Sequence, residues 1–133
     1  MSTRPGKRAL SALALAFAAV AGVTTAPASA EVFDHCVRLG CSDARVAFDY
    51  WAAEGLPPRR VTNVLPDDQC YTGGGTYRNR DDQLPDEERG TYREFDVYPR
   101  PCGTQRDAHR IVVNHETRTA WYTDDHYSNF HRL

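Results

Sequence analysis

Lysine is nearly absent from this 133-residue sequence, in which Lys7 is the only one. Residues 31–133 contain no lysine, and their 13 arginines stand against 18 aspartates and glutamates, a formal charge of −5. Proteins that bind polyanions through overall charge are basic, because they must neutralise many phosphates. The composition therefore excludes that class, and any phosphate binding by this chain has to come from a local cluster of arginines.

Long hydrophobic runs are also missing, apart from one near the N-terminus. Basic residues precede an alanine-rich apolar run over residues 9–23, and the small-residue sequence "APASA" follows it. This order is typical of a secretory signal peptide. A retained membrane anchor is the alternative, but a membrane span needs about 20 apolar residues. We expect a signal peptide at 1–30 and a secreted, extracellular, monomeric domain at 31–133, with no membrane association after cleavage.

Cysteine is scarce, with four in the chain, all after the predicted signal peptide. Four cysteines in a small exported domain predict two disulfides. Cys36, Cys41, Cys70 and Cys102 allow three pairings, and we favour 36–41 with 70–102 because the first two are close in sequence. A zinc site is the alternative, but it usually takes two close Cys or His pairs, and no His-Glu-x-x-His pattern occurs. We expect no metal and no other cofactor.

Residues 42–54 have the spacing of an amphipathic helix. Ser42 can cap the first turn with its hydroxyl, and Asp43 suits the positive end of a helix. Gly55 ends the pattern, and the two prolines that follow prevent the helix from resuming. The apolar positions recur three and four residues apart, at Ala44, Ala47, Phe48, Trp51 and Ala52. This face is predicted to pack into the core rather than to hold a cofactor.

The remaining sequence predicts strands after a loop-rich stretch. Prolines and three consecutive glycines over residues 55–75 indicate loops, with a short second helix near 59–65. Alternation with a period of two then predicts strands at 91–98 and 110–116, and two short runs follow between residues 119 and 132. This order predicts an α+β fold, in which an N-terminal helix packs on a C-terminal antiparallel β-sheet within one disulfide-stapled domain.

The strand pattern brings chemically useful side chains to one surface. Burial of the apolar residues at alternate positions turns Glu94 and Arg110 to the opposite face of the sheet. Arg106 in the preceding loop and His126 near the C-terminus can lean over the same surface. A carboxylate and an imidazole can divide the proton transfers of RNA cleavage by the ribose 2′-hydroxyl, while guanidinium groups hold the phosphate. The alternative is a solvated Glu–Arg pair with an unrelated surface histidine.

Three motifs occur in one order along the chain. They are "TYRNRDDQLP" (76–85), "TYREFDVYPRPCGTQRDAHRIVV" (91–113) and "WYTDDHYSNF" (121–130). In order and spacing, they resemble the small secreted microbial ribonucleases, the guanyl-specific barnase and ribonuclease Sa family. The resemblance implies that Glu94 is the general base and His126 the general acid. It also implies that Arg106, Arg110 and Tyr127 contact the phosphate.

The resemblance further implies a base-recognition loop made of Tyr77, Arg78, Asn79 and Arg80. In such a loop Tyr77 stacks on the purine, and backbone N–H groups meet the O6 atom of guanine. The family has a glutamate where this chain has Asp81, and that glutamate accepts hydrogen bonds from guanine N1–H and the exocyclic amine. Asp81 is one methylene shorter, so we expect a weaker guanine preference unless the loop moves inward or Asp82 takes its place.

The residues and the resemblance together predict a metal-independent, secreted endoribonuclease. It would cleave single-stranded RNA by transesterification through a 2′,3′-cyclic phosphate, with a preference for guanine. A non-catalytic secreted module for RNA or an acidic protein partner is the alternative, and it predicts binding without turnover. A toxin directed at competing cells would use the same chemistry. An acidic inhibitor protein of the barstar kind is a partner implied by the resemblance alone.

Overall fold

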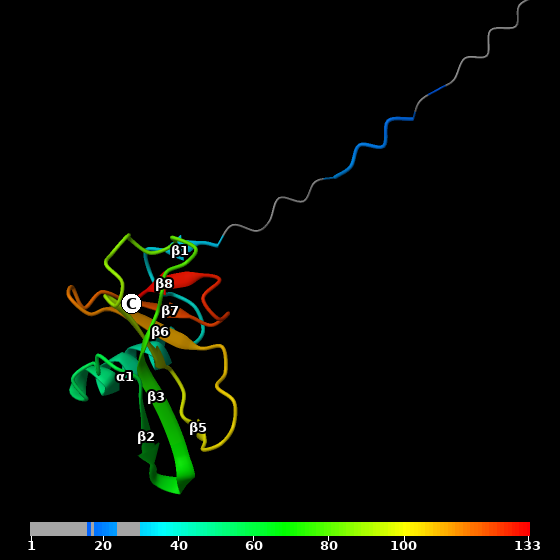
Figure 1. The fold of residues 1–133 in the computed structure, drawn as a ribbon. Helices are drawn as coiled ribbons and strands as arrows, with labels where there is room; N and C mark the ends of the chain where they lie inside the picture. The colour runs from blue at the N-terminus through cyan, green and yellow to red at the C-terminus, as the bar shows by residue number, and fades with distance from the viewer. Residues whose placement is uncertain (1–15, 17, 24–29) are drawn as a thin grey trace, which may run out of the picture.

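One helix and one eight-stranded sheet build the domain (Figure 1). The computed structural model describes residues 16, 18–23 and 30–133, so most of the predicted signal peptide lies outside the described residues. The elements in chain order are β1 (Val32–Phe33), α1 (Cys41–Ala53), β2 (Val61–Leu65), the 3-10 turn η1 (Pro66–Asp68), β3 (Gln69–Thr76), β4 (Tyr92–Asp96), β5 (Arg100–Pro101), β6 (Arg110–Asn114), β7 (Ala120–Thr123) and β8 (Phe130–Arg132). The predicted α+β class is confirmed.

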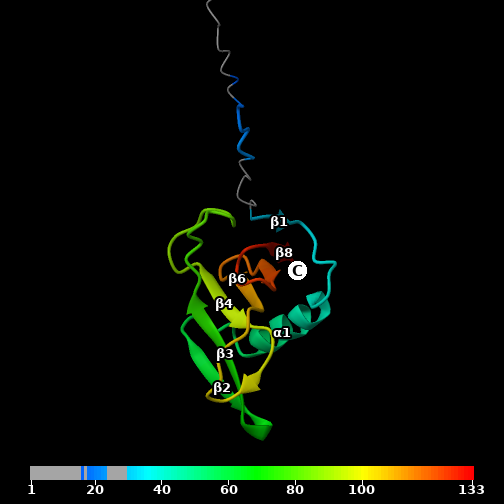
Figure 2. The same cartoon turned by 90° about the vertical axis from the view of Figure 1, so that its right-hand side faces the viewer.

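The sheet follows the order β1-β8-β7-β6-β4-β3-β2, and β5 pairs with β3 beside that path. Neighbouring strands are antiparallel as predicted, except that β1 runs parallel to β8. This parallel pair joins the start of the domain to its end, and the backbone N–H of Phe130 donates to the carbonyl of Glu31 at 2.9 Å. The side view shows α1 against one face of the sheet (Figure 2). No helix in the described part of the chain has the length and apolar character of a membrane span.

Helix α1 buries the face that the spacing predicted, with Ala44, Ala47 and Trp51 all inaccessible to solvent. Its start differs from the prediction by one residue. The N-cap is Gly40 in the left-handed region, with no side-chain cap, so Ser42 lies inside the first turn and cannot cap it. A side chain at position 40 would collide with the ring and hydroxyl of Tyr122.

Residues 61–76 form two paired strands, so the prediction of loops and a short helix for this stretch was wrong. The three glycines belong to the end of β3, where the register against β4 shifts between Gly73 and Gly75. A Cβ atom on Gly73 would collide with the Phe95 ring and would lie 3.0 Å from Trp51. Glycine is therefore present because large side chains from distant parts of the chain cross the strand here, and local sequence does not reveal that.

Two apolar clusters lie on opposite faces of the sheet. The first lies under the helix and combines Trp51 with Phe95, Ile111 and Tyr122. The second lies on the other face and consists of Leu84, Tyr92, Val112, Trp121 and Phe130. Side chains along β4 and β6 thus alternate between the two faces of the sheet as predicted, and Glu94 lies on the face away from the helix.

Both disulfides have the pairing that the sequence favoured, Cys36–Cys41 and Cys70–Cys102. The first closes a short loop directly before α1. The second spans a sequence separation of 32 and joins β3 to the residue that follows β5. Each disulfide therefore anchors a different part of the domain.

Candidate active site

Glu94 and Arg110 lie on the neighbouring strands β4 and β6, on the face of the sheet that the alternation predicted. Glu94 is 6 % exposed and Arg110 3 % exposed, and Arg110 Nε lies 3.4 Å from Glu94 Oε2. The loop between β5 and β6 brings Arg106 to the same carboxylate, Glu94. Arg106 donates two hydrogen bonds to Glu94, from Nη1 to Oε1 at 2.9 Å and from Nη2 to Oε2 at 2.7 Å. The structure therefore brings three of the four predicted catalytic residues into direct contact.

Asp96, which the sequence analysis missed, is a second buried carboxylate in this cluster. It follows Glu94 by two residues on β4, is 2 % exposed, and accepts a hydrogen bond of 2.7 Å from Arg106 Nε. Arg110 Nη1 lies 3.4 Å from Asp96 Oδ1, the oxygen that accepts from Arg106. Burial alone lowers the pKa of Arg106, but hydrogen bonds and attraction from Glu94 and then Asp96 outweigh it and raise that pKa. Alternation places Asp96 on the same face as Glu94, and this pattern could have identified Asp96 from the sequence.

His126 lies at the edge of this cluster on the loop after β7. It is exposed, and it lines one hollow together with Arg106 and Arg110. The His126 and Tyr127 rings are 4.8 Å apart, and the Tyr127 hydroxyl lies 3.4 Å from Glu94 Oε2 as a hydrogen-bond donor. Glu94 and His126 thus occupy the same side of the sheet.

The loop that carries His126 adopts an unusual backbone. His126 and Tyr127 have φ angles of 53° and 72°, in the left-handed region that favours glycine. Asp125 stabilises this conformation: its Oδ1 accepts from Ser128 N at 3.1 Å and Asn129 N at 2.9 Å. Non-glycine residues in such conformations cluster at functional sites, where the surrounding structure holds them.

A cavity of about 620 Å³ lies between the predicted base-recognition loop and the His126 loop. It is lined by Ala30, Thr76, Tyr77, Arg78, Asn79, Arg80, Asp81, Gln83, His126, Tyr127, Ser128 and Asn129. All the predicted base-recognition residues therefore face one cavity, and His126 belongs both to this cavity and to the hollow with Arg106. Gln83, which the sequence analysis missed, ties the two loops together through a 2.9 Å hydrogen bond to the Ser128 carbonyl.

Within that cavity, Tyr77 and Asn79 have different surroundings. The Tyr77 ring stacks on Tyr127, with ring centroids 5.0 Å apart and an interplanar angle of 29°. Burial and then the charge of Asp81 raise the pKa of Tyr77 to about 12. The Asn79 side chain turns back onto the Leu84 backbone, donating at 2.8 Å and accepting at 3.1 Å. Asn79 therefore shapes the loop, whereas Arg78, Arg80 and Asp81 remain exposed.

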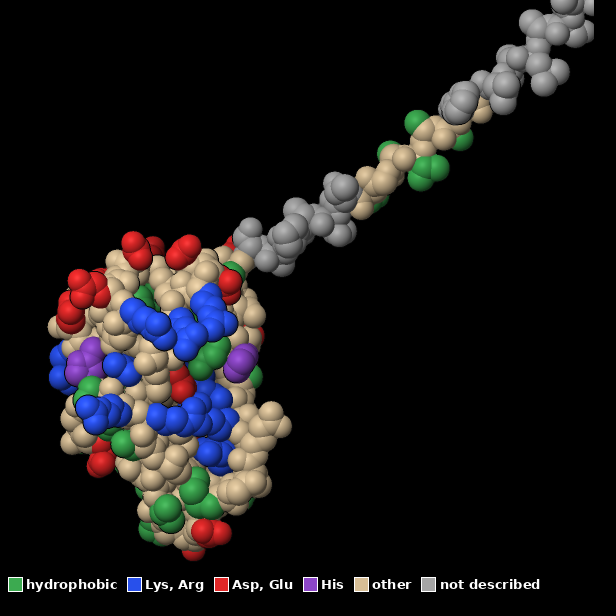
Figure 3. Space-filling view, in the orientation of Figure 1, with side chains coloured by type: hydrophobic (Ala, Val, Ile, Leu, Met, Phe, Trp, Pro, Cys, Tyr) green, Lys and Arg blue, Asp and Glu red, His purple; other side chains and the backbone are tan. Residues whose placement is uncertain are grey.

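Arginine side chains gather near the middle of the face shown in Figure 3, around a small area of acidic atoms. The chain as a whole is acidic, so any phosphate binding has to come from a local cluster of arginines such as this one. Among the described residues, no three His, Cys, Asp or Glu side chains are arranged to hold a metal ion.

The match to a protein-family model decides the family. The model described as ribonuclease matches residues 42–133, most of the chain. The chain belongs to the ribonuclease family. It is similar to guanyl-specific ribonuclease Sa of Kitasatospora aureofaciens, at 35 % identity over 80 residues, 56 % of this chain and 82 % of the relative. It is also similar to guanyl-specific ribonuclease St of Saccharopolyspora erythraea, at 40 % identity over 57 residues, 43 % of this chain and 54 % of the relative.

A solved structure of ribonuclease Sa2 with exo-2′,3′-cyclophosphorotioate also matches this ribonuclease. The identity is 25 % and the TM-score is 0.47, over 69 % of this chain and 84 % of that one. The family assignment itself rests on the sequence model, which spans α1 and every strand from β2 to β8. This protein is accordingly an endoribonuclease, and RNA is its substrate.

Proposed function

We propose that this ribonuclease is secreted and cleaves single-stranded RNA after guanosine, by transesterification through a 2′,3′-cyclic phosphate. The observation that carries the proposal is the contact of Glu94 with Arg106 and Arg110, which line one hollow together with His126. The relatives named above are described as guanyl-specific, and this supports the base preference.

Glu94 is the general base of the proposed reaction. It takes the proton of the ribose 2′-hydroxyl while the 2′-oxygen forms a bond to the adjacent phosphorus. The bond from phosphorus to the 5′-oxygen of the next nucleotide breaks, and His126 gives that leaving oxygen a proton. The products are a 2′,3′-cyclic phosphate and a free 5′-hydroxyl. Carboxylate and imidazolium suit these roles, because proton transfer in the transition state needs a positioned base and a positioned acid.

Arg106 and Arg110 stabilise the negative charge that grows on the phosphate oxygens. Preorganised donors of this kind are usually the largest electrostatic contribution to such a reaction. Arg110 lines the hollow beside Arg106, with its Nε atom buried 3.4 Å from Glu94 Oε2. The Tyr127 hydroxyl, beside Glu94, is a further donor for the same phosphate.

The cavity beside His126 takes the guanine base. Tyr77 supplies an aromatic surface for the purine, and backbone N–H groups of the recognition loop meet the guanine O6 atom. Asp81 accepts hydrogen bonds from N1–H and the exocyclic amine, with the shorter reach of aspartate. Bidentate contacts of this kind contribute about 1–3 kcal/mol of base discrimination. The proposed preference for guanine is therefore weaker than a glutamate at position 81 would give.

Residues 1–30 act as the signal peptide that exports the domain. Their basic start, apolar run and "APASA" sequence support this assignment. Two disulfides in the domain suit an oxidising compartment outside the cytosol. An acidic inhibitor protein that covers the arginine-rich face would be complementary to it in charge.

Cleavage of a modified RNA in the presence of EDTA tests this proposal. One oligonucleotide has a single guanosine in an all-ribose background, and its matched partner carries a 2′-deoxy sugar at that guanosine. We expect the first to be cut after guanosine, with a cyclic phosphate detected by mass spectrometry, and the second to remain intact at that link. Cleavage at the deoxyguanosine link would contradict the mechanism, because the nucleophile is missing there. A requirement for metal would contradict it as well.

A further inference from the structure

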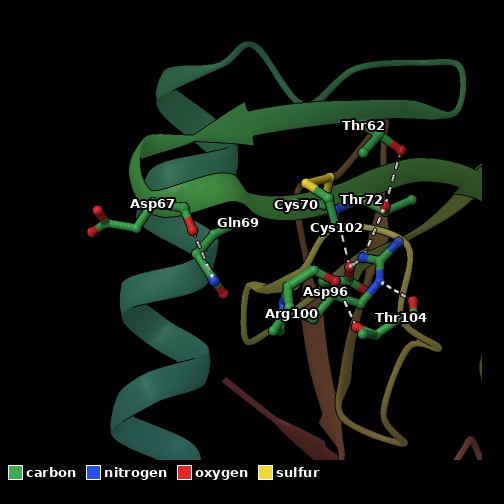
Figure 4. The surroundings of a disulfide bond; sticks show 10 residues. Thr62, Asp67, Gln69, Cys70, Thr72, Asp96, Arg100, Cys102 and Thr104 are labelled. Carbon is green, nitrogen blue, oxygen red and sulfur yellow. Dashed lines mark hydrogen bonds and ion pairs between the residues drawn. A yellow bond between two sulfur atoms is a disulfide. The ribbon is translucent and has the colours of Figure 1, made fainter.

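We propose that Arg100 and the Cys70–Cys102 disulfide form a positioning unit that holds Arg106 in its catalytic orientation. Arg100 does not contact Glu94 and has no place in the proposed reaction. Its guanidinium lies near the Cys70–Cys102 disulfide, and its Nη1 atom donates to Oδ2 of the Asp96 carboxylate (Figure 4). The inference rests on the proposed role of Arg106 in holding the phosphate.

Asp96 links the two arginines because each binds a different oxygen of its carboxylate. Arg100 Nη1 donates to Asp96 Oδ2 at 3.0 Å, while Arg106 Nε donates to Asp96 Oδ1 at 2.7 Å. The backbone N–H of Thr72 also donates to Oδ2, at 2.9 Å. The carboxylate is therefore fixed from the β3 side by two donors, and its other oxygen faces Arg106.

Arg106 is shared between two carboxylates, so its position depends on the balance between them. Nη1 and Nη2 donate to Glu94, Nε donates to Asp96, and Nη2 also lies 2.6 Å from Asp96 Oδ1. Arg100 neutralises part of the charge on Asp96, which is 2 % exposed and gains little screening from water. Without Arg100, Asp96 attracts Arg106 more strongly, and the guanidinium moves away from the orientation that serves Glu94 and the phosphate.

The disulfide fixes Arg100 and the start of the loop that carries Arg106. β5 is only two residues long and pairs with β3 through Gln69–Pro101 and Cys70–Arg100. Cys102 follows β5 directly, is joined to Cys70, and donates from its backbone to Asp68 at 2.9 Å. Arg106 lies four residues further along. A two-residue strand is weakly held by its ladder alone, so the covalent link limits the freedom of this loop.

The Arg100 side chain itself also supports the loop. Its Nε donates to the Thr104 carbonyl at 3.0 Å, and Nη1 donates to the Thr72 hydroxyl at 3.2 Å. Arg100 thus contacts β3, β4 and the Arg106 loop at once. Arg100 therefore supports the loop that carries Arg106 and also offsets the charge of Asp96, although it is a positioning residue and not a catalytic one.

Steady-state kinetics on a guanylyl dinucleotide separate positioning from simple stability. We compare Arg100→Gln, Arg100→Lys, the double variant Cys70→Ser/Cys102→Ser, and the matched control Cys36→Ser/Cys41→Ser. Assays run below the unfolding transition of each variant, with circular dichroism as the check of folding. We expect Arg100→Gln and the Cys70/Cys102 variant to lower kcat about tenfold to a hundredfold, the scale for misplacing a reacting group by about 1 Å. KM should change much less, because the base cavity is built from other residues.

Arg100→Lys should recover part of the lost kcat, since lysine restores the charge but not the planar fork. The control variant should keep the full kcat, because Cys36–Cys41 joins the start of α1 to the segment before it and does not hold the Arg106 loop. Unchanged kcat in Arg100→Gln would overturn the inference, and so would equal losses in both disulfide variants. If the Cys70/Cys102 variant does not fold, Arg100→Gln and Arg100→Lys decide alone. Arg106→Ala is the separate test of the proposed function, because a fully active Arg106→Ala variant would contradict the role of Arg106 itself.

Discussion

Arg106 clamps Glu94 with two hydrogen bonds, Nη1 to Oε1 at 2.9 Å and Nη2 to Oε2 at 2.7 Å. Paired bonds of this kind fix both the position and the plane of the carboxylate. The proposed base and the proposed phosphate-binding group are therefore oriented by one another before the substrate arrives. An incoming phosphate has to share Arg106 with Glu94, so damage to this contact affects proton transfer and phosphate binding together.

Replacing His126 with Gln should lower kcat by roughly two to four orders of magnitude, the usual scale for a general acid. Glutamine keeps a polar side chain but cannot donate and recover a proton. The wild-type rate should be bell-shaped in pH, and the fall on the alkaline side should disappear in the variant. His115→Gln is the matched control, because His115 bonds the Leu56 carbonyl away from the site. A near-normal rate in His126→Gln would remove His126 from the mechanism.

Replacing Asp81 with Glu should strengthen the preference for guanine over adenine. The longer side chain reaches further into the cavity and can accept both guanine N1–H and the amine. We expect the ratio of kcat/KM values to rise roughly tenfold, within the 1–3 kcal/mol of one bidentate contact to a base. The measurement compares two dinucleotides that differ only in the base 5′ to the cut. Asp82→Glu is the control, and an increase there alone would show that Asp82 reads the base.

Adding a methyl group at Gly75 should lower activity more than stability. A Cβ atom there would lie 2.8 Å from Glu94 Oε1, so the carboxylate must move. We expect Gly75→Ala to lower kcat about tenfold to a hundredfold, as for a displacement of about 1 Å. Gly73→Ala, whose Cβ would meet Phe95 and Trp51, should instead lower the free energy of unfolding by about 1–3 kcal/mol. Urea unfolding and dinucleotide kinetics on both variants distinguish these effects, and a normal kcat in Gly75→Ala would contradict the first.

Replacing Asp125 with Asn should destabilise the protein more near neutral pH than in acid. Burial alone raises the pKa of Asp125, but hydrogen bonds from Asn129, then Thr123 and Ser128, outweigh it and lower that pKa below its usual range. A lowered folded-state pKa stabilises the fold above the ordinary value of about 3.9, and the contribution is lost as pH falls through the folded value. We expect a loss of about 1–2 kcal/mol at pH 7.

Urea unfolding of Asp125→Asn at pH 7 and at pH 3 measures this contribution. The difference from wild type should shrink at the lower pH, because the Asp125 carboxylate of the unfolded chain, with an ordinary pKa of about 3.9, is largely protonated there. Asp49→Asn, an exposed position on α1, is the matched control and should change little at either pH. An equal loss at both pH values would show that the carboxylate charge does not hold the His126 loop.

The helix and the face of Glu94 were predictable because each follows from a local period. Spacing of three and four residues predicted α1, and alternation predicted which side chains of β4 and β6 leave the core. β2 and β3 were missed because their signal is not local. Gly73 is a glycine within a strand because a side chain there would meet Trp51 and Phe95, which are distant in sequence. Read alone, three successive glycines favour a loop.

The site was predictable in its residue types but not in its support. Glu94, Arg106 and Arg110 were identified, whereas Asp96 and Arg100 were not. The sequence places Asp96 on the correct face, yet its burial and its contacts with three arginines depend on how the loop after β5 folds back. Asp125 likewise gains its role from hydrogen bonds to residues that follow it in the loop.

The structure of this ribonuclease with bound guanosine 3′-monophosphate would test the central claim most directly. We predict that the phosphate lies in the hollow with Arg106 and Arg110, and that the Glu94 carboxylate and the His126 ring each come within about 3.2 Å of its oxygens or the ribose 2′-oxygen. The guanine should occupy the cavity beside Tyr77. A phosphate that binds elsewhere, or one that reaches only Glu94 or only His126, would contradict the account.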